Sequence, residues 1–590
     1  MYLRSVKVRA KQGTFHEYLR LVESYRENGK VKQRVFMNLG RKDLLAPHLG
    51  SLVRLLSRPE DDYVRARDVQ PASAWDWGAI LCAQSLWQEL GLGDILDRLV
   101  GPGRASEPTP ADRCFVLVAN RLCAPSSEHG LARWLEESYL CDRKGRRWVA
   151  SWRDDEERRQ SKTPRVRVEP KQLQRWYRTL DQLLASKEQI EKELYLRLRD
   201  LFSLKVDLAF YDVTSTYFEG HGPAPFAAHG HSRDHQPRKR QVVVGVVMVD
   251  DWPIAHHVFA GNTRDSTTVS KVLADLERRF GIRRVTFVGD RGMVTSDNVE
   301  LLRSLQHGYV VGLNRRRNDK VLEYLQRLTD KWIDCPVGIT AREKSKPPRT
   351  RVQEVPSGEE GVRVFVVDSE ERLVYEQAQR LKSMARVQEQ LEGLKKRVEE
   401  GRIKAPDKVG AAAARILARN HGIRYCGWEY SNGTFRYFEH PVNLTREKAY
   451  EGKYIIQTEE SSLSPVEVVQ IYKNLTQVEK AFRNLKDVID MRPIYHQTPH
   501  RTQAHIFVAA LALLLHTALE KKLRAAGLDL SATEALRVLK TVRIVDLDLG
   551  DGRQKRGATK GSATCQPVLA ALGLTDLEAP PQPRHRPTIG

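Results

Sequence analysis

The first forty residues alternate between apolar and polar side chains, as β-strands do. Two such segments, Val22–Arg26 and Lys30–Met37, flank Asn28-Gly29, a dipeptide that favours the two-residue turn of a β-hairpin. The pattern therefore predicts a hairpin within a first region, residues 1–70.

From about Trp75 to Leu201 the apolar residues recur at helical spacing, as in Lys187–Phe202. A loop rich in arginine, Arg143–Lys171, interrupts these segments. Contact with DNA and a plain solvated surface are equally good explanations of that loop. We expect residues 71–203 to be helical and to recognise DNA ends.

Near residue 204 the pattern changes to apolar runs of strand length separated by amphipathic segments. Three strands, then helix, strand, helix and strand is the order of a ribonuclease-H-like sheet, so we expect an α/β core that begins with residues 204–317. The strands are Lys205–Asp212, Gln241–Asp250, Ile254–Phe259, Arg284–Asp290 and Tyr309–Leu313, and the helices are Ser266–Phe280 and Asn298–Leu305. β-Branched residues nearly fill Gln241–Asp250, which predicts a central, buried strand.

The sheet pattern breaks after residue 317 and resumes at Lys453–Thr458, before a helix that starts at Pro465. Residues 318–450 include a long charged helix, Glu370–Glu400, and are predicted to form a mixed α/β domain inserted between the last core strand and the last core helix. Residues 451–525 complete the core. Residues 526–590 form a C-terminal region whose Pro-rich tail is expected to be disordered.

Composition narrows the class of protein. With 590 residues, of which 41% are hydrophobic, the chain can bury substantial cores. Its 97 basic and 75 acidic residues give a net charge of +22. So basic a protein usually binds a polyanion, most often nucleic acid, with a membrane surface as the weaker alternative.

The sequence favours the cytoplasm. Met1–Arg9 alternates like a strand and lacks the apolar core of a signal peptide, so we expect no signal peptide. The longest apolar stretch, Ile506–Leu515, is too short to cross a bilayer and predicts a buried helix. Seven scattered cysteines without a CxxC pair argue against a disulfide framework or a zinc ribbon.

Three acids are candidates for a metal site. Asp212 and Asp290 each end an apolar run, and their strands would be neighbours in the expected sheet; acids at strand ends are otherwise turn formers. Glu479 lies on the predicted helix Val466–Ile489. At about 100° per residue it shares a face with Tyr472, Arg483 and Lys486, although an ordinary amphipathic helix would also expose a polar side.

Several blocks, in order from about residue 205 to 515, resemble the DDE transposases of bacterial insertion sequences, in the branch with a Tyr-x2-Arg-x3-Glu-x6-Lys signature. The blocks are YDVTSTYFEG (211–220), GHSRDHQP (230–237), HHVFAGNTRDSTTV (256–269), GDRGM (289–293), YKNLTQVEKAFRNLK (472–486) and RPIYHQTPHRTQAHIFVAALAL (492–513). Tyr472, Glu479 and Lys486 match the signature at its spacing. Leu475 stands where the signature has Arg, and Arg483 could supply the missing charge.

The resemblance implies that Asp212, Asp290 and Glu479 are catalytic and hold two Mg²⁺ ions, for which Mn²⁺ can substitute. One site would then cut DNA at the ends of the element and join the freed 3′ end to target DNA, while Tyr472 and Lys486 grip the phosphate beside the cut. The DNA-binding candidates are Tyr472, Lys486, Arg483, Arg291 and Arg233.

The expected partners are double-stranded DNA, both terminal inverted repeats and target, and a second copy of the chain in a homodimer on that DNA. The expected location is the bacterial cytoplasm at the nucleoid, without a membrane. Two alternatives stay open: a metal-dependent nuclease that does not join strands, and a catalytically inactive DNA-binding relative. Zinc fits the histidines of the 221–235 loop poorly, because no cysteine accompanies them.

Overall fold

The computed structural model describes the chain except for residues 11–13, 28, 51–68, 102–107, 144, 146, 149–169, 205, 284, 291–292, 294, 316–317, 319, 337–347, 420, 551–552 and 581–590. The chain divides into two units: Met1–Ala74 with Ile544–Ala558, and Trp75–Arg543 with Thr559–Leu577. The predictions for Arg291, for most of the loop 143–171 and for the tail from residue 581 fall outside the described residues.

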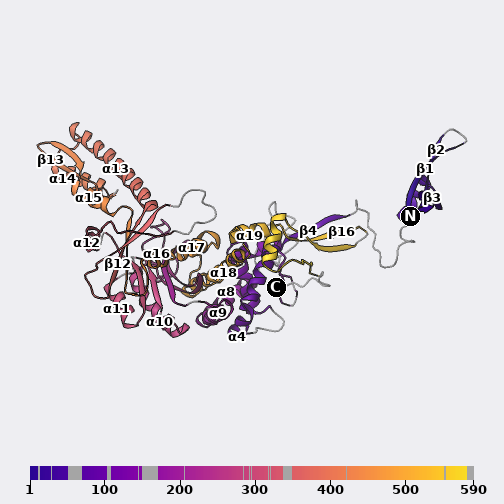
Figure 1. The fold of residues 1–590 in the computed structure, drawn as a ribbon, viewed down its shortest axis with the longest axis horizontal. Helices are drawn as coiled ribbons and strands as arrows, with labels where there is room; N and C mark the ends of the chain where they lie inside the picture. The colour runs from indigo at the N-terminus through magenta and orange to yellow at the C-terminus, as the bar shows by residue number, and fades with distance from the viewer. Residues whose placement is uncertain are drawn as a thin grey trace. The chain divides into compact units, whose positions relative to one another are not determined.

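The first unit begins with the antiparallel strands β1 (Tyr2–Arg9), β2 (Phe15–Glu27) and β3 (Lys30–Arg41) (Figure 1). Glu27 pairs with Lys30, and Gly29 between them has φ +74°, so the predicted hairpin is confirmed. β1 extends it to three strands, and the short helices α1 (Lys42–Leu45) and η1 (Ala46–His48) follow. A second sheet has the order β17-β16-β4. Its strands are Gln554–Ala558, Arg543–Asp548 and Gln70–Asp76.

The second unit starts with helices, as the sequence predicts for Trp75–Leu201. They are α3 (Gly78–Glu89), α4 (Leu92–Val100), α5 (Pro110–Cys123), α6 (Leu131–Glu137), α8 (Pro170–Ala185) and α9 (Lys187–Phe202). Helices α5 and α8 pack along α18 (Pro499–Ala525). Helix α18 is long and apolar enough to cross a membrane, yet 83% of its most apolar window is buried inside the protein. The predicted buried helix is therefore confirmed.

The main sheet of this unit contains five strands in the order β7-β6-β5-β8-β9. They are β5 (Leu208–Tyr217), β6 (Gln241–Val249), β7 (Trp252–Ala260), β8 (Thr286–Gly289) and β9 (Gly308–Gly312). Strands β5, β6 and β7 are antiparallel, whereas β5, β8 and β9 are parallel. This is the order expected of a ribonuclease-H-like sheet, with α10 (Val269–Phe280) and α11 (Ser296–Ser304) in the predicted places.

Strand β6 is buried at every position, as predicted, but it is not central. It lies one strand from the edge formed by β7. Burial here comes from helices rather than from a middle position, because α9, α17 and α18 pack on the β5-β6-β7 side of the sheet.

Four further strands extend the sheet beyond β9 in the order β15-β12-β11-β10. They are β15 (Lys453–Thr458), β12 (Arg363–Ser369), β11 (Thr350–Val355) and β10 (Ile333–Asp334). Part of residues 318–450 thus belongs to the main sheet, because β12 pairs along its length with β15. Helix α12 (Lys320–Gln326) packs beside them.

The rest of residues 318–450 forms a separate small core. It comprises α13 (Glu370–Glu399), α14 (Pro406–Arg419), β13 (Cys426–Ser431), β14 (Thr434–Glu439) and α15 (Pro441–Tyr450). Val387, Leu391, Val409 and Phe435 are among its buried residues, and α13 and α14 lie side by side (Figure 1). The predicted long charged helix is confirmed as α13. We call Glu370–Glu451 the helical subdomain.

The predicted single helix Val466–Ile489 is wrong. The structure has α16 (Pro465–Lys473), α17 (Thr476–Arg483) and a π-helical stretch, η5 (Asn484–Val488). Between α16 and α17 the backbone bonds tighten to the i→i+3 type: Leu475 N donates to Tyr472 O at 3.1 Å, and Val478 N to Leu475 O at 3.0 Å. A constant 100° per residue therefore does not apply across this segment. Helices α19 (Ala532–Leu539) and α20 (Gln566–Ala571) follow α18.

Candidate active site

Asp212 and Asp290 occupy equivalent places on neighbouring parallel strands. The last parallel pair between β5 and β8 is Tyr211 with Gly289, and each acid is the next residue. The sequence predicted that Asp212 ends its strand, and this is wrong. Strand β5 continues to Tyr217, and beyond Asp212 it is paired with β6 alone. Asp212 lies instead where the parallel pairing stops, so both carboxylates lie at one edge of that pairing.

Glu479 brings a third acid to this place from α17. The pKa of Asp212 is raised to about 7, first by burial and then by the negative charges of Asp290 and Glu479, while a hydrogen bond from Val213 N to Asp212 Oδ1 at 2.7 Å and the charge of Arg233 oppose the shift. Glu479 itself is exposed. The three acids named from the sequence are therefore close enough to act on one another.

Tyr472 reaches the same place from α16. Its hydroxyl donates a hydrogen bond of 3.4 Å to Asp290 Oδ1, and its ring stacks on Tyr454 with centroids 5.8 Å apart. The approach needs a glycine in β9, because a Cβ at Gly312 would lie 2.2 Å from the Tyr472 hydroxyl. The phenol is thus held between the sheet and the acid.

Lys486, the last residue of the signature, binds an acid that the sequence did not single out. Its Nζ donates to Asp234 Oδ1 at 2.7 Å, and Arg492 Nη1 donates to the same oxygen. The side chain of Asp234 is only 2% exposed and that of Lys486 only 11%. Burial lowers the pKa of Lys486, whereas Asp234 opposes this effect.

Arg233 precedes Asp234 in the same loop and is tied to two elements of the core. Its backbone N donates to Ser215 Oγ of β5 at 2.9 Å, and its Nη2 donates to Asp265 Oδ2 at 2.6 Å. Its positive charge lowers the pKa of both Asp212 and Lys486. The loop thus lies near Asp212 and Lys486.

Other residues on this helical segment lie elsewhere. Arg483 is exposed on α17, and Leu475 at the signature's arginine position is buried at 6% exposure. Asp487 Oδ1 accepts a hydrogen bond of 2.7 Å from Arg492. Asp490 is exposed and has φ +53°, which a short polar residue tolerates.

Among the described residues, one group of histidines and acids has the spacing of a metal site: Glu128, His496 and His505, within 4.8 Å of one another. Both ring nitrogens of His505 are engaged, since Nδ1 lies 3.3 Å from Arg121 Nη2 and Nε2 lies 3.1 Å from Met491 O. Both His505 nitrogens are therefore already in contact with protein groups, one of them a guanidinium.

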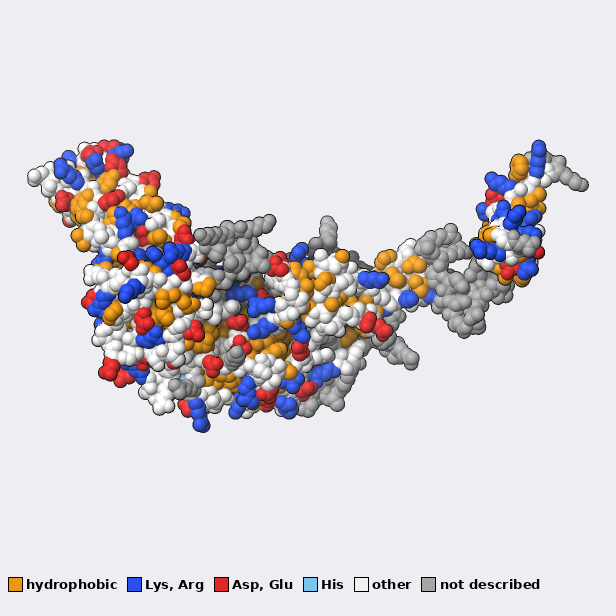
Figure 2. Space-filling view, viewed as in Figure 1, with side chains coloured by type: hydrophobic (Ala, Val, Ile, Leu, Met, Phe, Trp, Pro, Cys, Tyr) orange, Lys and Arg blue, Asp and Glu red, His pale blue; other side chains and the backbone are white. Residues whose placement is uncertain are grey.

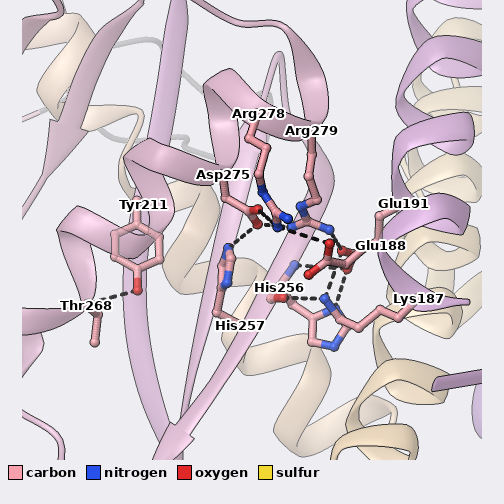
Figure 3. Close-up of polar contacts among 10 residues, drawn as sticks. All are labelled: Lys187, Glu188, Glu191, Tyr211, His256, His257, Thr268, Asp275, Arg278 and Arg279. Carbon is pink, nitrogen blue, oxygen red and sulfur yellow. Dashed lines mark hydrogen bonds and ion pairs between the residues drawn. The ribbon is translucent and has the colours of Figure 1, made fainter. Parts of the chain in front are cut away.

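A second buried charge network joins α9 to β7 and α10 (Figure 3). Its members are Lys187, Glu191, His256, His257, Asp275 and Arg279. Lys187 Nζ donates to the carbonyl of His256 at 2.8 Å, which satisfies an acceptor of the edge strand. A cavity of about 340 Å³ lies beside the network. Because burial favours the neutral ring, the pKa of His256 falls to about 4 and that of His257 to about 3.

Basic residues do not gather into one patch on the visible face of the protein, where blue and red side chains are interleaved (Figure 2). The tryptophans Trp148, Trp332 and Trp428 are buried or partly buried. Trp332 and Trp428 pack against buried clusters, and Trp148, in the arginine-rich loop, is 3% exposed and lies against Trp176.

Two family models match the chain. The model described as IS1634 family transposase, N-terminal domain, matches residues 3–68. The model described as Transposase DDE domain matches residues 207–515, which is more than half of the chain. No curated protein matches it.

Proposed function

The chain belongs to the DDE transposases, enzymes that cleave DNA and transfer its strands, and from this premise we propose that Asp212, Asp290 and Glu479 are its metal-binding catalytic residues. The observation that carries the proposal is the register of β5 and β8, which puts Asp212 and Asp290 directly after the same residue pair. Glu479 is the helical acid whose charge reaches Asp212.

The donor set fits Mg²⁺. All three groups are carboxylates, the oxygen ligands that hard divalent cations prefer. Asp212 is a buried acid that its two neighbours make harder to ionise, so a dication there would offset both the lost hydration and the repulsion. When bound, such ions lower the pKa of an attacking oxygen and stabilise the leaving oxygen of a phosphodiester.

We assign the substrate phosphate to the cationic side of the site. Lys486 has an ammonium with three donors, of which Asp234 takes one. Tyr472 contacts Asp290 and so stands next to the acids. These two residues support membership of the Tyr-Arg-Glu-Lys branch, while Leu475, buried under α17, cannot take the role of the missing arginine.

The wider architecture completes the proposal. We infer that residues 1–70 and 71–203 recognise the ends of the element, that residues 318–450 are an insertion between the last strand and the last helix of the core, and that residues 526–590 form a C-terminal region. Two copies would assemble on paired DNA ends in the bacterial cytoplasm, at the nucleoid. The family match to residues 3–68 and the separate core of the helical subdomain support this arrangement.

The deciding experiment uses the purified protein, Mg²⁺ and labelled duplexes that carry the inverted repeats found beside the coding region. We expect cleavage at the repeat and joining of the cut 3′ end to a second duplex. Cleavage without joined product would favour the nuclease, and binding without either product would favour the inactive relative. Glu479→Gln is the control, because it should abolish both products.

A further inference from the structure

We propose that Asp234 is a positioning residue of the reaction, which holds the ammonium of Lys486 where it meets the substrate phosphate. The proposal rests on the proposed function and deepens it. As an anion, Asp234 would repel a phosphate rather than bind it. It would therefore act on the reaction through Lys486, to which it is hydrogen-bonded.

The geometry is that of a single acceptor shared by two cations. Asp234 Oδ1 accepts from Lys486 Nζ at 2.7 Å and from Arg492 Nη1, while Oδ2 is buried and accepts no hydrogen bond from the described residues. Arg492 also binds Asp487, so its charge is shared between two carboxylates. Asp234 takes one of the three donors of the Lys486 ammonium, which suits a second, phosphate acceptor.

The loop that carries Asp234 is itself fixed. Arg233 N donates to Ser215 Oγ on β5, three residues beyond Asp212, and Gln236 N donates to Ser232 Oγ at 2.9 Å. Lys486 approaches from η5, so the ion pair joins the loop to the helical segment that carries Glu479. Asp234 therefore connects the two sides of the site.

A flexible lysine needs such a partner here. Its stem has several rotatable bonds, and burial makes its charged form costly unless a carboxylate is near. Without the charge of Asp234, Lys486 would still be present, but its ammonium would no longer be held in the site. The effect should therefore appear in the rate of cleavage and not in the affinity for DNA, to which many other basic residues contribute.

The test is a double-mutant cycle on the full-length protein with single-turnover cleavage of an end duplex. We expect Asp234→Asn to lower the cleavage rate about tenfold or more, to leave the Kd for DNA within about twofold, and to be largely rescued by Asp234→Glu. In a Lys486→Met background, Asp234→Asn should have almost no further effect, because its route of action is already gone.

Asp487→Asn is the matched control, because Asp487 also binds Arg492 but not Lys486, and it should cleave at close to the wild-type rate. Full additivity of Asp234→Asn and Lys486→Met would overturn the proposal, as would an equal loss in Asp487→Asn. Should Asp234→Asn fail to fold, Asp234→Ser, which also removes the charge, gives the same comparison in the two backgrounds. Cleavage that persists in Glu479→Gln would instead refute the proposed function.

Discussion

The hydroxyl of Tyr472 lies 3.4 Å from Asp290 Oδ1, so a side chain of α16 donates to the acid that follows β8. Tyr454 behind the ring and Gly312 beneath the hydroxyl leave the phenol little freedom. The carboxylate of Asp290 is therefore oriented by a residue 182 positions away in the chain. The hydrogen bond between Tyr472 and Asp290 thus links helix α16 to the end of strand β8.

Glu479→Gln is expected to abolish Mg²⁺-dependent nicking and to leave DNA binding intact, because it removes one metal-holding charge from an exposed position and no packing contact. Asp490→Asn should cost little, since the backbone at φ +53° accepts asparagine as readily as aspartate. Gel analysis of nicking with parallel anisotropy measurements checks both. Near wild-type nicking by Glu479→Gln, or its loss in folded Asp490→Asn, would contradict the assignment.

Asp212→Asn should make the metal-free protein more stable at pH 8 while it removes activity. The folded-state pKa of about 7 exceeds the ordinary value of 3.8, so the cost of ionising Asp212 grows from pH 3.8 to 7 and is fully present above pH 7. Asparagine does not carry this cost and can keep the hydrogen bond from Val213 N. Thermal unfolding at pH 8 and pH 5 measures the difference.

The stabilisation should be smaller at pH 5 than at pH 8, and Mg²⁺ should raise the unfolding midpoint of the wild type more than that of Asp212→Asn. A lower midpoint for the variant at pH 8 would show that the carboxylate is not under strain in the metal-free site.

Stability should fall as the pH drops from 6.5 towards 4. The neutral forms of His256 and His257 are favoured in the folded state, where their pKa values are about 4 and 3 against 6.5 when unfolded. The unfolded chain therefore takes up protons first, and stability is lost across this window. The pKa values of Glu191 and Asp275 are lowered in the folded protein. These carboxylates therefore add to the loss of stability only when the pH falls to about their ordinary pKa values of 4.5 and 3.8.

Unfolding midpoints at pH 7.5, 6.5 and 5.5 check this expectation, with His256→Gln/His257→Gln as the comparison. The double variant should show a shallower slope, although His505, whose pKa is also lowered by burial, keeps part of it. An unchanged slope would mean that the two rings are not the groups responsible.

Excision of the helical subdomain should leave a folded core that cleaves poorly. Ser369 N donates to Gly452 O at 2.9 Å, so a short Gly-Ser linker can replace Glu370–Glu451 and keep β12 and β15 paired. Arg315, 5% exposed, binds Glu376 and the carbonyl of Tyr450. Both of these partners are removed by the excision, which would leave a buried charge without them. The excised form therefore also carries Arg315→Met, and full-length Arg315→Met is its control. Unchanged cleavage would refute a role for the subdomain, and loss of cooperative unfolding would refute its independence.

Deletion of residues 1–68 should remove discrimination between element ends and random duplex, while salt-sensitive binding to any duplex remains. A larger deletion through residue 200 would be uninformative, because α5 and α8 pack on the apolar α18. Binding curves at several salt concentrations, on end and random duplexes, give both quantities. Full discrimination by the shortened chain would place recognition elsewhere.

The local sequence pattern was sufficient to predict an element where its contacts are close in the chain or where it is buried along its whole length. The β-branched residues of β6, the hairpin around Gly29 and the long charged α13 were all predictable. The extent of β5 was not, because Thr214, Ser215 and Thr216 read as a polar loop yet are buried at 4% exposure or less. Strands β10 and β11 were missed because β10 spans two residues and is defined by its pairing with β11, which in turn pairs with β12.

The sequence named the three acids and Tyr472, chiefly through the resemblance, and the structure brings Tyr472 to Asp290 and the other two acids near Asp212. Asp234 was not named there, although its neighbour Arg233 was a candidate for DNA binding. An acid in a loop with glycine, histidine and proline has no periodicity to mark it. Its importance arises only when Lys486, 252 residues later, folds against it.

The π-helical stretch Asn484–Val488 has a consequence for how relatives of this chain should be compared. A π turn holds about one residue more than an α turn, because its hydrogen bonds span five residues instead of four. The number of residues between Glu479 and Lys486 therefore does not by itself determine the direction in which the lysine side chain leaves the helix. A relative that is one residue shorter here could present the same lysine to the same phosphate, and an alignment scored by spacing alone would discard it.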